Sequence, residues 1–585
     1  MTSKSSVFDG LVIMLKYWSA FLMTVVVTSV IACSSDGEGP SLTASPAVVS
    51  TIAPDQTTPI APTSAPMTPT PPPAGVPTIA PGQTTPIAPT PEPSCSRVPG
   101  SSDIAAAPPE VARNATLWPL PNKDYAGTRS SFDSRITSET VGDLEPAWEF
   151  DFPESTAWGA VASSPLVMDE IVYVQDLSSN IYAFDFCSGE MLWERAGEGP
   201  SLAPNGLAVG WGKVFAASSA ADFVALDSST GDLLWRAPIE LTSTEGIDIQ
   251  PVVYDGLVYL STAPRSEEGL YQGNATGIIY ALEQETGRIK WEFNTVDSED
   301  IWGNREVNSG GGAWFPVSID TDRGMTYWGI GNPAPFPGTE EFPNGSSRPG
   351  PNLYTDSMVA LDHETGELEW YNQVRPHDLF DMDFHISPIL VTTEIDGVAR
   401  DVALGAGKTG TVHAFDADTG EEYWVTEVGI HLNDDTMEIP PGESVTVYPG
   451  LLGGVETHMA YADGMVYVPV INSPATFTST SGKLGSGRAG SVVAIDVKDG
   501  SIRWETEFDS WVLGSATIVN DLVLTAAGQT VYWFDRANGD IVGSVEVSAW
   551  VNAPLVAAGD TIIIPAGFPL APGQKPQLIV LRLPD

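Results

Sequence analysis

The sequence is poor in cysteine and in basic residues, and each shortage excludes a class of function. Its 585 residues include three cysteines, and no C-x-x-C-H motif or zinc-type cluster of cysteine and histidine occurs. A haem attached through that motif is therefore excluded. Lysine and arginine number 26 against 75 acidic residues, a net charge of -49. This imbalance argues strongly against a nucleic acid or an anionic membrane surface as partner, and it favours solubility in a salty medium.

The N-terminus has the features of an export signal. Lys16 precedes an apolar run, Trp18 to Ala32, that is short and polar for a membrane-spanning helix. The run ends in Val30-Ile31-Ala32-Cys33, which resembles the lipobox of exported lipoproteins. The resemblance implies a signal peptide over residues 1–32, cleavage before Cys33 and acylation of its thiol. A membrane-spanning anchor that starts near Gly10 is the alternative.

Residues 33–95 consist largely of proline, threonine, serine and alanine, and the segment Thr51 to Thr63 returns almost unchanged as Thr78 to Thr90. This composition buries too little apolar surface to offset the entropy of ordering, so we expect an extended, semi-rigid tether. Tether and lipid together predict a globular domain, residues 110–585, held outside the membrane as a cell-surface or periplasmic lipoprotein. Cys95 and Cys187 either pair in a disulfide at the end of the tether or are both unpaired.

One pattern recurs from Leu144 to the C-terminus. An apolar strand leads to Asp, two variable residues and Thr-Gly or a near equivalent, and a second strand then ends in Trp. The seven copies are Ala183 to Trp193, Ala225 to Trp235, Ala281 to Trp291, Ala360 to Trp370, Ala414 to Trp424, Ala494 to Trp504, and a degenerate Trp533 to Gly543.

Each copy predicts a hairpin in which Asp and Thr bond the turn, Gly takes a positive φ, and Trp packs on the next copy. Short sheets repeated at irregular spacing are typical of an all-β protein, a β-propeller with tryptophan-docking repeats. We expect eight blades, with seven as the main alternative. The ring would close by pairing the strand around Trp148 with the strand near Leu578.

The repeat resembles that of the PQQ-dependent (quinoprotein) alcohol dehydrogenases, which are eight-bladed propellers that bind pyrroloquinoline quinone (PQQ). The segment Asn122 to Phe150 is similar to the family's opening blade, and the likeness extends over nearly all of the chain after the tether. The repeat by itself does not specify a function, because non-enzymatic scaffold propellers of outer-membrane assembly carry it too.

Four motifs resemble the family's site. Trp314, after the glycines of NSGGGAW, matches the Trp on which the quinone lies, and Lys408 in GAGKTG matches a basic residue near the quinone oxygens. Asn332 in GNPAPF matches a metal ligand. Asp381 in HDLFD matches the catalytic Asp, and Asp383 resembles the additional carboxylate of the lanthanide-dependent branch. Glu268, or else its neighbour Glu267, lies near the place of a further metal-binding Glu.

These residue types also fit one chemistry on physical grounds. Stacking on an indole holds a flat cofactor, and a hard cation takes oxygen ligands from Asn332, Asp381 and Asp383. Two carboxylates at i and i+2 point the same way only if the chain stays pleated. Asp381 would accept the proton of a hydroxyl while hydride passes to the quinone. Calcium and a lanthanide ion both suit these ligands.

Several positions depart from the family's pattern. The vicinal cysteine pair is absent, and the Arg that binds cofactor carboxylates is replaced by Asn205. The family's Asn-Trp after Gly453-Gly454 becomes Val455-Glu456-Thr457-His458. Losing a bidentate Arg weakens the hold on a tricarboxylate unless another cation substitutes. Candidates by proximity in sequence are Arg305, Arg348 and Arg375.

Two functions follow from the resemblance. The first is a tethered extracytoplasmic dehydrogenase that oxidises a small alcohol or a sugar hydroxyl and passes electrons to cytochrome c or a similar acceptor. The second is a non-catalytic propeller lipoprotein, a surface scaffold or ligand-binding module. The combination of the GNPAPF and HDLFD motifs favours the enzyme, since a scaffold has no need of it.

Overall fold

The computed structural model describes residues 100, 102, 104–201, 204–239, 241, 244–265 and 273–584. The chain divides into two compact units, Met1–Glu92 and Pro93–Asp585, and the described residues belong to the second. The predicted signal peptide, Cys33, the tether, Cys95 and Glu268 lie outside the described residues. Cys187 is disulfide-bonded. Among the described helices, none has the length and apolar character needed to cross a membrane.

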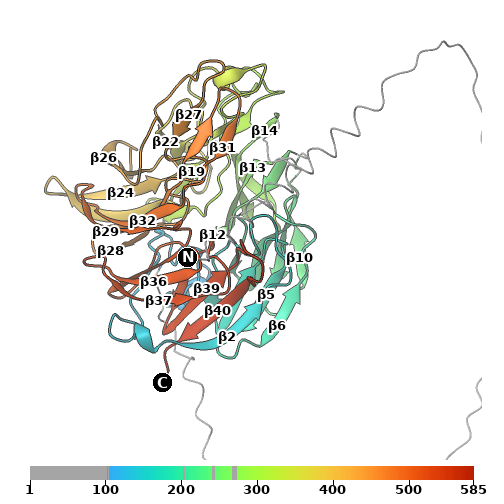
Figure 1. Cartoon of the computed structure of the whole chain (residues 1–585). Coiled ribbons are helices and arrows are strands. Elements are labelled where there is room, and N and C mark those ends of the chain that lie inside the picture. Colours follow the sequence, from blue (N-terminus) through green and yellow to red (C-terminus); the bar gives the residue numbers. More distant parts are fainter. Residues whose placement is uncertain are drawn as a thin grey trace, which may run out of the picture. The chain divides into compact units, whose positions relative to one another are not determined.

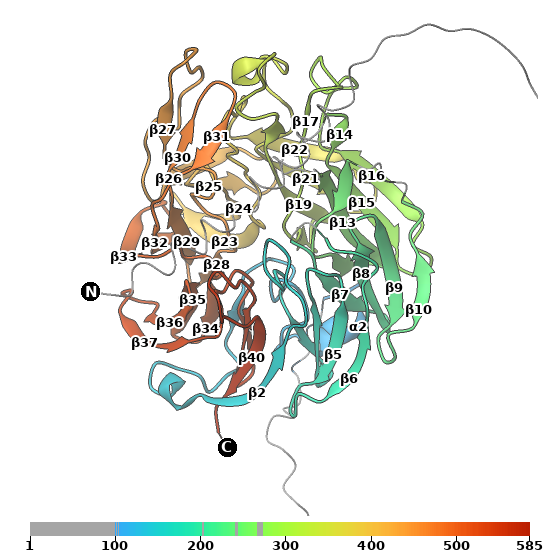
Figure 2. The ribbon, with the colours of Figure 1, turned by 45° about the vertical axis from the view of Figure 1, so that its right-hand side comes forward.

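The described residues form eight four-stranded antiparallel sheets that follow one another around a ring (Figure 1 and Figure 2). The first four sheets contain β3 (Leu166–Met168), β4 (Ile171–Gln175), β5 (Ile181–Asp185) and β6 (Met191–Arg195); β7 (Leu207–Gly210), β8 (Lys213–Ser219), β9 (Asp222–Asp227) and β10 (Leu233–Arg236); β12 (Val252–Tyr254), β13 (Leu257–Pro264), β15 (Ile278–Glu283) and β16 (Ile289–Asn294); β18 (Ser318–Asp320), β19 (Met325–Ile330), β21 (Ser357–Asp362) and β22 (Leu368–Gln373).

The last four sheets contain β23 (Ile389–Ile395), β24 (Val398–Ala406), β25 (Thr411–Asp416) and β26 (Glu422–Glu427); β28 (Ala460–Ala462), β29 (Met465–Asn472), β32 (Ala489–Asp496) and β33 (Ile502–Phe508); β34 (Thr517–Val519), β35 (Leu522–Ala527), β36 (Thr530–Asp535) and β37 (Ile541–Glu546); β38 (Val556–Ala558), β39 (Thr561–Ala566), β40 (Gln577–Arg582) and β2 (Glu145–Asp151). The prediction of an all-β chain is confirmed.

Short elements decorate these sheets. β1 (Ser130–Ser131) pairs in parallel with β34, and β11 (Glu245–Ile247) pairs with β13. The others are the small sheet of β14 (Ala275–Thr276), β17 (Ser309–Gly310) and β20 (Pro333–Ala334), the small sheet of β27 (Val445–Val447), β30 (Ala475–Phe477) and β31 (Gly482–Leu484), the helix α2 (Pro109–Arg113), and the 3₁₀ turns η1 (Val141–Asp143) and η2 (Pro343–Gly345).

Burial separates the inner and outer strands of each sheet. The first strands β3, β7, β34 and β38 are buried at every residue. In the fourth strands β6 and β37, by contrast, most residues are exposed. Because blades are arranged around a central channel, the fully buried first strand borders the axis and the fourth strand lies at the rim. Segments that precede the first strands therefore meet at one end of the axis.

Tryptophan joins neighbouring sheets as the repeat predicts. The indole Nε1 of Trp291 donates to the carbonyl of His363 in the next hairpin at 3.0 Å, and Trp370 donates to Ala417 at 3.0 Å. Gly366, with φ +74°, lies under the ring of Trp291, where a Cβ would come within 2.6 Å of its atoms. A positive φ and this close approach both require glycine at the turn. Trp148, Trp193, Trp235, Trp424 and Trp504 make the same type of bond.

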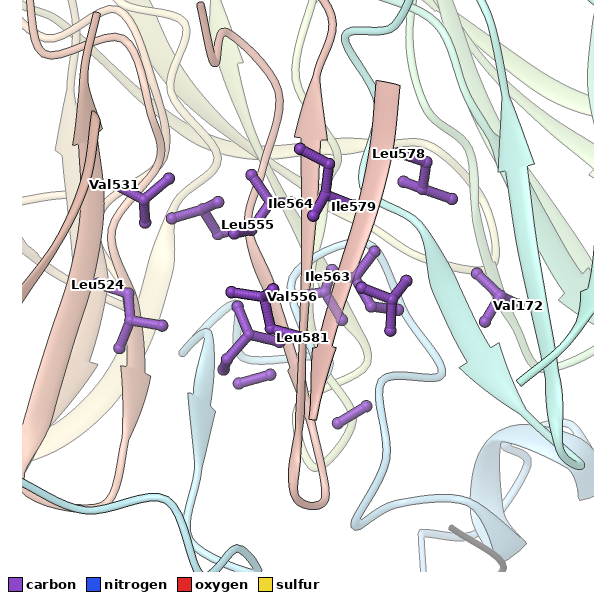
Figure 3. Packing of buried hydrophobic residues seen from close by; sticks show 14 of the residues in the cluster. Val172, Leu524, Val531, Leu555, Val556, Ile563, Ile564, Leu578, Ile579 and Leu581 are labelled. Atoms are coloured by element: carbon purple, nitrogen blue, oxygen red, sulfur yellow. The ribbon is translucent and has the colours of Figure 1, made fainter. Parts of the chain in front are cut away.

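The ring closes differently. β2 pairs antiparallel with β40, so strands from the two ends of the domain complete one sheet, as predicted. Gly543 stands in β37 where the other copies have Trp. In the sheet that β37 faces, the paired strands β40 and β2 are far apart in sequence, so no Thr-Gly turn joins them. Apolar packing holds this junction instead: Figure 3 shows Ile563 and Leu578 between Val172 of β4 and Leu524 of β35.

Candidate functional site

A cavity of about 250 Å³ lies at one end of the axis. It is lined by segments that precede the first strands of seven of the sheets, and because these strands border the axis, chain segments far apart in sequence converge here. In chain order, the seven segments place in the cavity wall Trp158, Asn205, Gln250, Trp314, Asp383, Glu456 and Asn552. Lys408 lines it too, from the turn between β24 and β25.

One side of the cavity carries charge that is already paired. Lys408 Nζ lies 2.8 Å from Asp381 Oδ2 and 2.7 Å from Asp383 Oδ2, so both carboxylates share one ammonium group. All three side chains are at most 12% exposed. We refer to Asn332, Asp381, Asp383 and Lys408 as the acidic wall.

The two carboxylates converge by a geometry that the sequence pattern does not predict. The segment is not a pleated strand, because Asp381 has φ +67°, in the left-handed region that aspartate tolerates better than most residues. Asp378 stabilises the bend, since its carboxylate accepts the N–H groups of Phe380 at 2.9 Å and Met382 at 2.8 Å. The condition of a pleated chain is therefore not met, and a loop folded around Asp378 brings the two carboxylates together instead.

Gly331 brings the indole and the amide to the same point. The backbone N–H of Asn332 donates to Asp383 Oδ1 at 2.7 Å. A Cβ on Gly331 would lie 2.5 Å from Asp383 Oδ1 and 2.6 Å from Trp314 Nε1. Only a residue without a side chain lets the indole and the carboxylate approach so closely.

Burial and Lys408 set the ionisation of the acidic wall. Burial raises the pKa of Asp381 well above its ordinary value, although the ammonium group of Lys408 opposes the shift. Burial acts on Asp383 in the same direction, but Lys408 and the N–H of Asn332 outweigh it and hold its pKa below the ordinary value. One carboxylate is therefore a fixed anion, and the other is the better proton acceptor of the two.

Other residues that line the cavity carry polar atoms that the described residues leave unpaired. They are Asn205 Oδ1, Glu456 Oε1 and His458 Nε2, each buried and without a hydrogen-bond partner in the described part of the chain. We refer to Asn205, Glu456 and His458 as the open wall. Burial raises the pKa of Glu456 to about 7, against the effect of Lys408. Unpaired buried polar atoms are costly, and a polar ligand in the cavity would satisfy them.

The structure brings together the predicted site residues that it describes. Trp314, Asp383 and Lys408 line the cavity, while Asn332 and Asp381 contact Asp383 and Lys408. Their roles stay predictions. Glu268 lies outside the described residues.

None of the three arginines that are candidates for binding cofactor carboxylates lines the cavity. Arg305 bonds Asn274, Arg348 bonds Asp378 O and Asn352, and Arg375 bonds Asp378. Sequence reasoning also missed His385, which lines the cavity two residues after Asp383. The signal that could have identified His385 was its place in the segment DMDFH, which also contains Asp381 and Asp383.

Comparisons with known proteins agree with the fold. A family model for the β-propeller domain of glucose, ethanol and alcohol dehydrogenases matches residues 118–207 and 242–431, and a model for the outer membrane protein assembly factor BamB matches residues 408–567. The chain is 24% identical over 538 residues to quinohemoprotein alcohol dehydrogenase ADH IIB of Pseudomonas putida, covering 80% of this chain and 76% of that protein. It is 27% identical over 419 residues to the dehydrogenase subunit of a quinone alcohol dehydrogenase of Gluconacetobacter polyoxogenes, covering 62% of this chain and 55% of that protein.

Solved structures show the same architecture. The quinohemoprotein alcohol dehydrogenase from Comamonas testosteroni superposes with a TM-score of 0.69 at 22% identity, covering 80% of each chain. A europium-containing methanol dehydrogenase gives 0.67 at 19% identity, covering 80% of this chain and 98% of that one. The fold is thus an all-β propeller. The protein is a β-propeller like those of the PQQ-dependent alcohol dehydrogenases, as the sequence predicts. The chain spans about half the length of several of these relatives.

Proposed function

We propose that the protein is an extracytoplasmic oxidoreductase that oxidises a hydroxyl group of a small alcohol or sugar, with PQQ and a calcium or lanthanide ion as cofactors. The observation that carries the proposal is that an indole, a carboxylate and a lysine, from Trp314, Asp383 and Lys408, line one cavity. A second carboxylate, from Asp381, pairs with the same lysine. The similarity to quinone-dependent alcohol dehydrogenases supports the same reaction class.

The donor set fits a hard cation. Asp381 and Asp383 already hold one positive charge between them, the ammonium group of Lys408. The backbone N–H of Asn332 donates to Asp383 Oδ1, so Asn332 is adjacent to this carboxylate, and its side-chain Nδ2 donates to Pro333 O. Carboxylate and amide oxygens are the ligands that calcium and lanthanide ions prefer. We assign the metal to Asn332, Asp381 and Asp383, and Glu268 remains a predicted fourth ligand.

The cavity also fits a flat polar cofactor. Trp314 lines it with an indole that is partly exposed, and its Nε1 has no hydrogen-bond partner among the described residues. An aromatic face holds a planar ring by stacking, and the unpaired atoms of the open wall offer hydrogen bonds at its edge. We assign the quinone to Trp314 and Lys408.

The chain's own residues would position the substrate and handle its proton. When bound, the quinone supplies the hydride acceptor and the metal supplies a Lewis acid. The carboxylate of Asp381 would accept the hydroxyl proton. Because burial raises the pKa of Asp381, its carboxylate is a stronger base than that of an exposed aspartate. Asp383 stays ionised beside Lys408 and keeps the local charge in balance.

The location and partners are part of the proposal. Export and acylation at Cys33 are supported by the sequence at residues 1–33, and the tether of residues 33–95 would hold the propeller outside the membrane. Electrons from the reduced cofactor would pass to a separate acceptor such as a cytochrome c. No nucleic acid is expected as partner, because the net charge is -49.

Reconstitution tests the proposal directly. We expect the full chain supplied with PQQ and calcium or lanthanum to reduce an artificial dye with a primary alcohol or sugar as donor. Asp381→Asn keeps the size of the side chain but removes its basicity, and we expect kcat to fall by at least about a thousandfold. Asp499→Asn makes the same change at an exposed turn and should retain full activity. Absence of turnover over a broad alcohol panel, with quinone and metal bound stoichiometrically, would refute the enzyme.

A non-catalytic propeller is the second candidate. The match of residues 408–567 to the BamB family model favours it. This candidate predicts that the purified chain gains no quinone absorbance after incubation with PQQ and either ion. The same titration thus separates the two candidates before any substrate is chosen.

A further inference from the structure

The charge around the cavity does not by itself match an anionic cofactor. PQQ is a tricarboxylate, and Lys408 is the one lysine or arginine among the described residues that line the cavity. That ammonium group already faces Asp381 and Asp383. A cofactor carboxylate therefore needs other hydrogen-bond donors, and the position where a guanidinium group would be expected from the family resemblance holds Asn205.

Glu456 is held rigidly at the open wall. The N–H of Val455 donates to the carbonyl of Gly407 at 2.9 Å, and Thr457 Oγ1 lies 2.8 Å from Ser515 Oγ, so both neighbours of Glu456 are fixed. The Glu456 side chain is 13% exposed. Its Oε1 has no partner in the described part of the chain, and its Oε2 is 3.9 Å from His385 Nε2, beyond hydrogen-bond range.

A carboxyl group in these surroundings favours the neutral form. Burial raises the pKa of Glu456 to about 7, with Asp383 adding to the shift and Lys408 opposing it. The ionisable groups that face Glu456 are Lys408, Asp383 and His385, whose Nε2 is 3.9 Å from Oε2. When protonated, the buried carboxyl presents an O–H donor to the cavity.

His458 adds a second donor next to it. Its Nδ1 is 3.4 Å from Ser515 Oγ, and its Nε2 has no partner among the described residues. The ring packs edge-on against Phe315 with centroids 4.7 Å apart. Burial lowers the pKa of His458 well below its ordinary value, so the ring is neutral. If Ser515 Oγ donates to Nδ1, the single proton of the neutral ring is on Nε2. The Nε2–H group of His458 is then a hydrogen-bond donor.

We propose that Glu456 and His458 act as a pair of neutral hydrogen-bond donors that bind a carboxylate of the quinone cofactor, in place of a guanidinium group. The inference rests on the proposed function. A neutral donor to a carboxylate avoids burying a second cation next to Lys408. Both residues are positioning residues, and neither takes part in the proton transfer assigned to Asp381.

Equilibrium binding of PQQ tests the proposal without any turnover. The affinity of the full chain for PQQ, with calcium present, is measured by dialysis at pH 6 and pH 8.5 for the wild type, Glu456→Gln, Glu456→Ala and His458→Ala. At pH 6 we expect Glu456→Gln to bind within about threefold of the wild type, because the amide keeps a donor. Glu456→Ala and His458→Ala should bind about tenfold to a hundredfold more weakly.

The pH dependence of PQQ affinity distinguishes direct binding by Glu456 from a purely structural role, which would not produce it. From pH 6 to pH 8.5 we expect wild-type affinity to fall at least about tenfold, since an ionised Glu456 repels the carboxylate, while Glu456→Gln stays constant. In calorimetry near pH 8 the wild type should take up a proton on binding and Glu456→Gln should not. Glu443→Gln, at an exposed site, removes the same charge and should behave as the wild type.

Three results would overturn the inference. If both Glu456 variants bind PQQ more tightly than the wild type at pH 6, Glu456 is a repelling anion. If Glu456→Ala and His458→Ala both bind PQQ as tightly as the wild type at pH 6, the open wall does not contact the cofactor, and the proposed function still stands. If the wild type binds no PQQ at either pH with calcium or lanthanum, the inference and the proposed function both fall.

Discussion

The two walls of the cavity differ in how their polar groups are paired. In the acidic wall, Asp381 and Asp383 share the ammonium group of Lys408, and a backbone N–H supports Asp383. In the open wall, buried atoms of Glu456 and His458 have no partner in the described residues. The first wall can fold with its charges balanced, whereas the second is complete only with a ligand. The difference separates residues suited to a cation from residues suited to the edge of a cofactor.

The largest effect is expected at the centre of the acidic wall. Lys408→Ala leaves two buried carboxylates with no cation between them, so the free energy of unfolding of the metal-free protein should fall by about 3–5 kcal/mol. Calcium or lanthanum should restore much of the loss, because either ion replaces the missing charge. Denaturant unfolding with and without the ion measures both effects.

The surface pair of Lys498 and Glu394 provides the control. Lys498→Ala breaks an exposed pair at 3.1 Å, and we expect it to cost less than about 1 kcal/mol with no response to metal. Equal stability of the two variants without metal would show that the acidic wall does not depend on Lys408.

The raised pKa of Glu456, in the open wall, should make the free energy of unfolding depend on pH. Glu456 has a folded-state pKa of about 7 against 4.5 when unfolded. Its contribution is therefore fully present below pH 4.5 and is lost as pH rises to 7, by up to about 3 kcal/mol. We expect Glu456→Gln to lack this part of the slope. Other buried acids add to the total, so the difference between wild type and variant is the quantity to compare.

A smaller effect is expected where Trp314 meets the acidic wall. The added methyl group of Gly331→Ala would approach Asp383 Oδ1 and Trp314 Nε1 within 2.6 Å, and overpacking of this kind costs about 1–3 kcal/mol. We expect weaker metal binding with little change in the pH slope assigned to Glu456. Gly212→Ala has open space around it and tests the effect of a strained φ without a clash.

Part of the site was predictable because its residues are adjacent in short motifs. Asp381 and Asp383 are two residues apart, and Trp314 and Asn332 occur in distinctive glycine-containing segments. The way in which the two carboxylates converge was not predictable, since Asp381 adopts a left-handed φ and Asp378 fixes the loop. The arginines were misplaced because proximity in sequence does not say to which side of a loop a side chain turns.

The closing junction shows the same limit for the fold. The pairing of β2 with β40 follows from the first and last apolar strands of the repeat series. The packing of Val172 against the closing sheet does not, because apolar contacts between sheets carry no motif. The presence of Gly543 in place of Trp is explained only by the tertiary structure, in which no hairpin turn joins β40 to β2 in the neighbouring sheet.

The sequence by itself determined the repeated hairpin, its docking tryptophan and hence the all-β propeller, because turn chemistry and alternation act within about ten residues. It also determined which side chains are capable of binding a cation or an aromatic ring. Tertiary structure alone decided that Lys408 joins the two carboxylates and that Glu456 and His458 face the same cavity. Lys408 and the two carboxylates belong to segments of one sheet, and Glu456 and His458 precede the first strand of the next sheet. Only strand pairing and the packing of these two sheets bring the groups to one cavity.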